Sequence, residues 1–561
     1  MTSETPSTEQ AHAAQRPSLV FGLFALLALQ LFVSIRYPWE DATYLETVLR
    51  PNTDLFVLLA LGLAAGLLLR LRFLPALFIT AALGLIPVYR AGATLVPALY
   101  GKPLVVYNDA MMLPGLLHIV LLNRTPLEQV LWSAAVVIAV ALIAVVLYRV
   151  VRLLLEFAPS EGPRRLDPTL ATLFVLAGLF SAVPLVATPG SVTQASTLVE
   201  LADEVDETLL EWGLHREYER SLSALHRERE AAPSDLARLQ GADVYVLYVE
   251  SYGRALYRKP EHKAELVELT ERLQLQLDHE GFYTCSAFAT SAVFGGSSSL
   301  AHAQLLSGTT VRSKHYYASL LASELEPLPH QFNRAGYRTL NVQPATTAEW
   351  PEGKFFGFTE DHFNDRFSYS GHTYHWGFMP DQFALAHLLA EEIRPSRKPV
   401  FLQYVSVTSH APFSMVPPYY EDWTEALEPR AFDGAPVKTY PIDVLNYTGH
   451  PDVEAGYVDT IHYSLETMIG FACQLERPSL VLVLGDHQPP GIGDFAHYDK
   501  SFEIPIHVLS NRPELLLPFV NQGFQAGFVP TDEYEAFDLS LLAPSLVSAF
   551  STASSEPVRD H

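Results

Sequence analysis

Three apolar segments of the chain each run into ionisable side chains that could bind a metal ion or a phosphate group. These are residues 243–249 (DVYVLYV) with Glu250, residues 399–407 (PVFLQYVSV) with the nearby His410, and residues 480–484 (LVLVL) with Asp486 and His487. Ligands of open α/β sheets bind at the carboxyl ends of the strands. Each ionisable residue alone is typical of an ordinary loop, but the agreement of three strand ends predicts one shared site.

A glycine-rich segment, residues 295–299 (GGSSS), places hydroxyl groups ahead of the apolar helical segment 300–306. Two glycines let the backbone approach a ligand closely, and a serine at the start of a helix lies where an anion is stabilised. A serine hydroxyl is a poor nucleophile unless a base or a metal ion lowers its pKa. A divalent cation held by Glu250, Asp486 and His487 would do this. By itself, GGSSS is more typical of a flexible loop and a helix N-cap.

The elements that must position these residues alternate between strands and helices. Further short runs rich in β-forming residues occupy 339–342 and 505–509, and longer helical or irregular stretches occupy 261–279, 381–393 and 453–475. Continuous apolar strands separated by helices predict an α/β domain with a mainly parallel sheet covered on both faces.

Charge and hydropathy divide the chain into two parts. Residues 1–189 hold 12 Lys/Arg and 11 Asp/Glu, whereas the remainder carries 25 basic and 51 acidic residues, so that it accounts for the net charge of −25. The acidic part has no basic tract that could neutralise phosphates, which excludes nucleic acid as a partner. A hydrophobic fraction of 49% and only two cysteines exclude a disordered chain and a disulfide scaffold.

Five apolar segments in the first part approach the roughly 17–25 residues that a membrane-spanning helix needs. They are residues 18–35, 55–69, 73–89, 131–148 and 169–187. The apolar segment 104–122 contains Asn108, Asp109 and His118, which favours an interfacial or re-entrant segment over a sixth span. Arginines cluster around residues 70–72 and 149–165, so these loops are expected in the cytoplasm and the C-terminal part outside it.

The predicted organisation is therefore an α-helical transmembrane domain of about five spans (1–189), a helical linker (190–240) and an extracytoplasmic α/β domain (241–561). The linker prediction depends on residues 197–230, an acidic amphipathic stretch that suits one or two helices. Cys285 and Cys473 are expected to be free thiols, although their positions neither require nor exclude one bridge.

Four motifs in this order resemble a known family. They are VLYVESYG (246–253), FGGSSSLAHAQLLSG (294–308), TSHAPF (408–413) and LGDHQPP (484–490). The chain resembles the membrane-bound, sulfatase-like members of the alkaline phosphatase superfamily, typified by lipoteichoic acid synthase and related phosphoglycerol transferases. The resemblance implies an alkaline phosphatase/sulfatase-like fold, with the catalytic domain outside a bacterial cytoplasmic (inner) membrane.

The resemblance also implies roles for individual residues. Glu250, Asp486 and His487 correspond to metal ligands, and His410 corresponds to a histidine that holds the substrate phosphate. The family nucleophile lies four residues before a Glu or His in the following helix, so His302 selects Ser298, with Ser297 as the alternative.

Two further residues are candidate substrate contacts. Trp350 falls where the family has a tryptophan and an arginine that contact the head group, but this chain has no arginine there. His497 follows the LGDHQPP motif and is either a substrate contact or an ordinary surface histidine.

The donor set suggests the metal. Three oxygen donors, from Glu250, Ser298 and Asp486, with the single imidazole of His487 favour Mn²⁺, with Mg²⁺ or Zn²⁺ as alternatives.

The implied activity is transfer of a phosphoglycerol group from a membrane phospholipid, with phosphatidylglycerol favoured, to a glycan or polymer acceptor through a phosphoserine-type intermediate. Alternatives are a phosphoethanolamine transferase and a non-catalytic protein that binds a head group or a glycan. The residues after Ser298 are Ser-Leu-Ala-His, which lack the C/S-x-P-x-R context of true sulfatases.

Overall fold

The computed structural model describes residues 19–34, 52–69, 73–100, 102–112, 125–156, 197–232, 234–347, 350–374, 377–442, 451–490, 501–531 and 535–552. The chain divides into two compact units. The first comprises Met1–Leu95 and Leu104–Leu210, and the second comprises Val96–Pro103 and Glu211–His561. The boundaries of the transmembrane domain, linker and catalytic domain given above remain predictions.

The first unit contains four apolar helices, counted over the described residues. They are α1 (Leu19–Val33), α3 (Thr53–Leu69), α4 (Phe73–Tyr100) and α7 (Pro126–Glu156). Two segments, Phe73–Pro97 and Leu127–Leu155, are long and apolar enough to cross a membrane. Helices α1 and α3 have only 15 and 17 residues, and the predicted span 169–187 lies outside the described residues. The count of five spans therefore remains a prediction.

The segment predicted to be interfacial or re-entrant is not a long helix where the structure describes it. Residues 102–112 contain only the short helices α5 (Val106–Asp109) and η2 (Ala110–Met112). Residues 113–122 lie outside the described part of the chain.

Helix α7 exposes large apolar side chains along most of its length. Val137, Ile138 and Leu142, for example, are more than half exposed. Such a surface would be unfavourable in water, whereas a lipid bilayer would cover it.

The second unit is built on one mixed sheet. Its strands are β1 (Asp243–Val249), β2 (Tyr283–Thr290), β3 (Arg338–Gln343), β4 (Glu360–Phe363), β5 (Val400–Val405), β8 (Ser479–Gly485), β9 (Glu503–Ser510), β10 (Gln525–Ala526) and β11 (Phe537–Asp538). Their order is β10-β2-β9-β8-β1-β5-β3-β4, with β11 paired to β2. The prediction of a mainly parallel sheet is right for β8-β1-β5-β3-β4. It is wrong for β9, which runs antiparallel to both β8 and β2.

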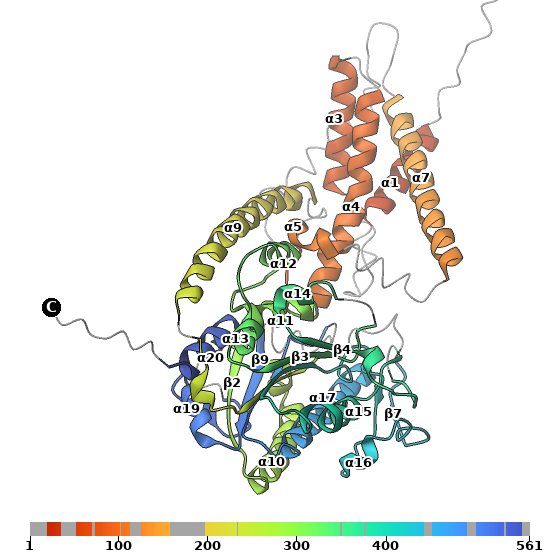
Figure 1. Cartoon of the computed structure of the whole chain (residues 1–561). Coiled ribbons are helices and arrows are strands. Elements are labelled where there is room, and N and C mark those ends of the chain that lie inside the picture. Colours follow the sequence, from red (N-terminus) through yellow and green to blue (C-terminus); the bar gives the residue numbers. More distant parts are fainter. Residues whose placement is uncertain are drawn as a thin grey trace, which may run out of the picture. The chain divides into compact units, whose positions relative to one another are not determined.

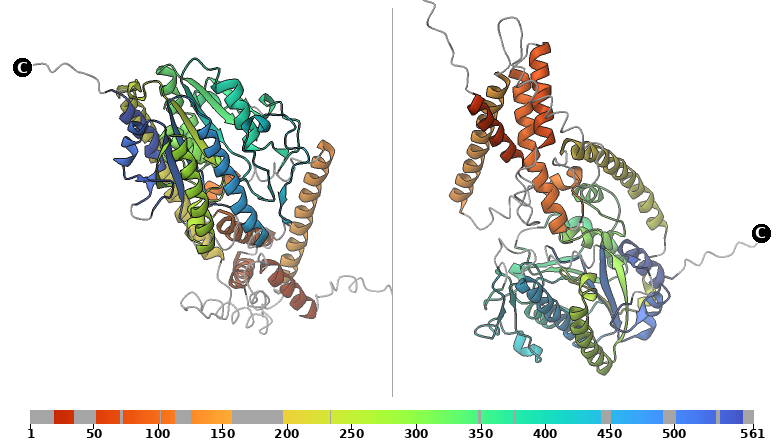
Figure 2. Two further views of the ribbon diagram at one scale, coloured as in Figure 1. Left: turned by 90° about the horizontal axis from the view of Figure 1, so that it is seen from below. Right: turned by 180° about the vertical axis from the view of Figure 1, so that it is seen from behind.

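Helices cover both faces of this sheet, as Figures 1 and 2 show. The helices on one face are α10 (Pro260–His279), α15 (Asp381–Leu388) and α17 (Pro451–Cys473), and those on the other are α11 (Ser298–Ser307), α12 (Lys314–Leu321), α13 (Leu328–Arg334) and α20 (Leu542–Phe550). A hydrophobic core lies on each face of the sheet. Alternate residues of β1 pack into these two cores, because successive side chains of a strand point to opposite faces. Tyr245 and Leu247 join the first core, and Val246 and Tyr248 join the second.

The predicted helical stretch after residue 196 forms one helix, α9 (Thr197–Ala231). Its C-terminal half contacts the turn after α11, where the Tyr218 hydroxyl lies 2.9 Å from Thr309 Oγ1 and Arg229 Nη2 donates to the Gly308 carbonyl. Cys285 and Cys473 are both free thiols, as expected.

His507 on β9 gives a testable pH dependence of stability. Burial lowers its pKa to about 3, and the ring stacks on Phe528 between the Tyr252 and Ser286 hydroxyls. The unfolded chain takes up this proton near pH 6.5, so the stability that neutral His507 provides falls as the pH drops from 6.5 towards 3, by about 1.4 kcal/mol per pH unit.

Replacing His507 by glutamine removes this linkage. We expect the thermal unfolding midpoint of the detergent-solubilised H507Q variant to fall less between pH 7.5 and pH 4.5 than that of the wild type. Parallel pH profiles of the two proteins would contradict the assignment.

Candidate functional site

The pairing of β1 with β8 brings two carboxylates to the same edge of the sheet. Val249 pairs with Gly485, so the next residues, Glu250 and Asp486, leave the two strands at the same level. A Cβ atom at Gly485 would lie 1.9 Å from the Tyr252 carbonyl oxygen. Only glycine therefore lets the chain after Glu250 cross this close to the end of β8.

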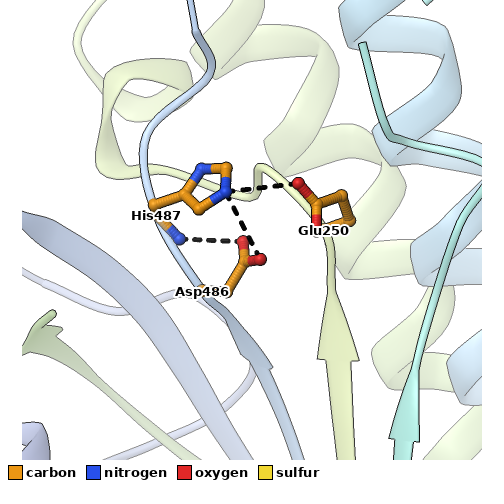
Figure 3. A group of neighbouring side chains, drawn as sticks. All are labelled: Glu250, Asp486 and His487. Carbon is orange, nitrogen blue, oxygen red and sulfur yellow. Dashed lines mark hydrogen bonds and ion pairs between the residues drawn. The ribbon is translucent and has the colours of Figure 1, made fainter. Parts of the chain in front are cut away.

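Glu250, Asp486 and His487 form a buried group of possible metal ligands, shown in Figure 3. The ligand atoms of the three residues all lie within 4.8 Å of one another. His487 Nε2 lies 3.2 Å from Glu250 Oε1 and 3.5 Å from Asp486 Oδ2. Asp486 Oδ1 accepts hydrogen bonds from the Ser251 and His487 amides, both at 2.8 Å, which fixes the carboxylate.

The hydrogen bonds of the group leave two ligand atoms directed at its centre. His487 Nδ1 lies 2.8 Å from the Gln488 carbonyl oxygen, which can only accept, so Nδ1 carries a proton and Nε2 faces the carboxylates. Asp486 Oδ2 is buried and has no hydrogen-bond partner in the part of the chain that the structure describes. A buried carboxylate oxygen without a partner is unfavourable unless a cation binds it.

Without a cation, the three groups strongly shift one another's protonation. Burial and the charge of Glu250 raise the pKa of Asp486 to about 8. Burial opposes a charge on His487, but the Asp486 and Glu250 carboxylates outweigh it and raise its pKa to about 9. A bound divalent cation would replace the proton as the charge that these carboxylates require.

Ser298 is the hydroxyl that the fold brings to this group. It is the first residue of α11, after Gly295, Gly296 and Ser297, all of which have positive φ angles. Ser298 Oγ donates to Glu250 Oε2 at 3.0 Å and lies 3.1 Å from His487 Nε2. Ser297 adopts a left-handed conformation (φ 64°) and makes no side-chain capping bond. Non-glycine residues in this conformation are strained, and such strain concentrates at functional sites.

His410 lies on the loop after β5 and is exposed. Its Nδ1 lies 2.7 Å from the Ala411 carbonyl oxygen, so Nε2 is the nitrogen that can accept a proton or contact a ligand. His410 is close enough for its charge to favour ionised Glu250.

Asp381 positions the backbone that precedes His410. Its buried carboxylate accepts hydrogen bonds from the Val407 and Thr408 amides and the Tyr404 hydroxyl. Sequence analysis did not identify Asp381, and its only signal was an aspartate after Pro380 at the start of a predicted helix.

Residues 265–513 match the family model described as Sulfatase. This part of the chain is a sulfatase-family domain. It contains Ser298, His410, Asp486 and His487, whereas Glu250 precedes the matched residues. The match confirms the resemblance to sulfatase-like proteins.

Solved structures with some similarity to the chain include three from bacteria. The lipoteichoic acid synthase LtaP of Listeria monocytogenes is 14% identical over 56% of this chain and 75% of its own, with a TM-score of 0.34. The phosphoglycerol transferase GacH of Streptococcus pyogenes, in complex with sn-glycerol-1-phosphate, is 12% identical over 60% and 91%, with a TM-score of 0.35. The lipooligosaccharide phosphoethanolamine transferase A (EptA) of Neisseria meningitidis is 12% identical over 94% and 96%, with a TM-score of 0.42. No curated protein sequence matches the chain.

Within the sulfatase-family domain, Trp350 is linked to the serine loop through three residues that sequence analysis missed. Trp350 stacks on Phe356, and the Phe356 ring packs against Tyr317. Lys314 Nζ lies 5.4 Å from the centre of the Tyr317 ring and donates to Ser299 Oγ at 3.0 Å. His497 lies outside the described residues.

Proposed function

We propose that the chain is a metal-dependent phosphotransferase that moves a phosphoglycerol group from a membrane phospholipid to a glycan or polymer acceptor. The observation that carries the proposal is the position of Ser298 Oγ, which lies within hydrogen-bonding distance of both Glu250 and His487 at the N-terminus of a helix. This arrangement supports a serine nucleophile beside a cation site.

Charge balance supports a metal ion at this site. The described residues contain a second acidic group, formed by Glu360, His362 and Glu392, but there the Arg338 guanidinium pairs with both carboxylates. Over the same residues, Glu250 and Asp486 form ion pairs with His487 and with no lysine or arginine. A divalent cation would neutralise this buried pair in place of protons, and the mostly oxygen donor set favours Mn²⁺.

Glu250, Asp486 and His487 would hold this cation, with Ser298 Oγ as a further ligand. When bound, the cation would lower the pKa of the serine hydroxyl and neutralise a phosphoryl oxygen.

Ser298 would then exchange one phosphoester bond for another. Its oxygen attacks the donor phosphorus, the bond from phosphorus to the diacylglycerol oxygen breaks, and the serine proton ends on the released diacylglycerol. His410 binds a phosphoryl oxygen through Nε2, and the dipole of α11 stabilises the same negative charge. An acceptor hydroxyl attacks the phosphoserine ester in the second step, and its proton returns to Ser298.

The proposed location is the outer face of a bacterial cytoplasmic membrane, with the chain crossing the membrane several times. The two helices long enough to span a bilayer and the exposed apolar side chains of α7 support a membrane anchor. A membrane anchor suits a lipid donor, because the diacylglycerol chains keep that donor in the bilayer.

The test is to incubate the purified full-length protein and Mn²⁺ with vesicles that contain labelled phosphatidylglycerol or labelled phosphatidylethanolamine. We expect metal-dependent release of diacylglycerol from phosphatidylglycerol. Release only from phosphatidylethanolamine would make this lipid the donor in place of phosphatidylglycerol. Release from neither lipid would contradict the proposed function.

A further inference from the structure

Lys314 is a partly buried cation next to the serine loop. It is the first residue of α12, and its Nζ donates to Ser299 Oγ at 3.0 Å. An ammonium group has three N–H donors, and among the described residues the only hydrogen-bond acceptor for it is this neutral hydroxyl.

No carboxylate among the described residues forms an ion pair with Lys314. Burial lowers the pKa of Lys314, and the more distant charge of Glu352 acts in the opposite direction. A charge withdrawn from water without an ionic partner costs stability. The partly buried Arg254, by contrast, pairs with Glu503.

The described contacts of Lys314 include no negatively charged group, so an anionic ligand would complete them. The Tyr317 ring lies beneath the ammonium group and packs against Phe356. Ser299 directly follows Ser298, so the ammonium contacts the residue next to the proposed nucleophile.

We propose that Lys314 binds a non-bridging phosphoryl oxygen of the donor and of the Ser298 ester, and so determines affinity for the anionic substrate. This inference rests on the proposed function. Lys314 thereby supplies a fixed positive charge to a domain whose net charge is strongly negative.

The test compares Lys314→Met, Lys314→Arg and a matched control, Lys354→Met. Lys354 is exposed, on the nearby α14 (Gly353–Phe356). Loss of a charged hydrogen bond to phosphate is expected to lower kcat/KM for vesicle-bound phosphatidylglycerol by about 10- to 100-fold in K314M. K314R is expected to retain most of the activity, and K354M is expected to match the wild type.

Two measurements separate this role from a structural one. Without substrate, K314M is expected to unfold at the same temperature as the wild type or a higher one, because it removes an unpaired buried charge. Inorganic phosphate with Mn²⁺ is expected to raise the unfolding midpoint of the wild type and of K354M, but to have little effect on K314M.

The outcomes also separate this inference from the proposed function. A lowered midpoint of substrate-free K314M, or an equal response of K314M and K354M to phosphate, would overturn the role of Lys314. If phosphate raises the unfolding midpoint of the wild type but not of K314M, and the wild type cleaves neither lipid, the anion site at Lys314 would be supported and the proposed function contradicted.

Discussion

Replacement of Ser298 by alanine is expected to reduce diacylglycerol release by at least about a thousandfold, because it removes the attacking atom itself. Ser298 Oγ is the hydroxyl that lies within 3.1 Å of both Glu250 and His487. Water could attack in its place, but without the helix-terminal position that orients the serine.

The matched control is Ser297→Ala. Ser297 is the adjacent residue, and its side chain makes no capping hydrogen bond. We expect S297A to retain activity within about tenfold of the wild type. Equal diacylglycerol release by S298A and the wild type would show that Ser298 is not the nucleophile, and selective loss in S297A would transfer that role to Ser297.

Replacement of Asp486 by asparagine is expected to abolish both metal binding and activity. The change removes one of two buried carboxylate charges and replaces either the unpartnered Oδ2 or the amide-bound Oδ1 by an NH₂ group. Loss of a charged ligand should reduce the affinity for a divalent cation by at least about a hundredfold.

The metal content of purified, dialysed proteins, measured by inductively coupled plasma mass spectrometry, tests this expectation. Glu360→Gln is the matched control, because it removes a carboxylate from the acidic group that Arg338 already neutralises. We expect one equivalent of metal in the wild type and in E360Q, and almost none in D486N. Stoichiometric metal in D486N would contradict the ligand assignment.

The candidate metal ligands could be predicted from the sequence because they follow a simple local pattern. Residues 243–249 and 480–484 are continuous apolar runs, and strands buried on both faces have this composition. Once both runs are strands of one sheet, their carboxyl ends lie together, and so do Glu250 and Asp486. Ser298 needed more than pattern, because GGSSS offers three serines and only the resemblance to a known family selected among them.

Other parts of the site depend on contacts between distant segments and could not be predicted in this way. Lys314 lies on α12 and Ser299 on α11, and only the packing of these two helices brings the ammonium to the Ser299 hydroxyl. Asp381, the first residue of α15, accepts hydrogen bonds from backbone amides that follow β5. The antiparallel course of β9 also leaves no local signal, since residues 505–509 read as an apolar strand in either direction.

The mass of the group attached to Ser298 tests the proposed function most directly. The full-length protein would be exposed to phosphatidylglycerol vesicles and Mn²⁺ without an acceptor, so that the second step is slowed, and then digested for peptide mass spectrometry. We predict one glycerophosphoryl group on Ser298, and none on the same peptide from D486N. An unmodified Ser298 in a protein that releases diacylglycerol, or a group attached to another residue, would contradict the covalent mechanism.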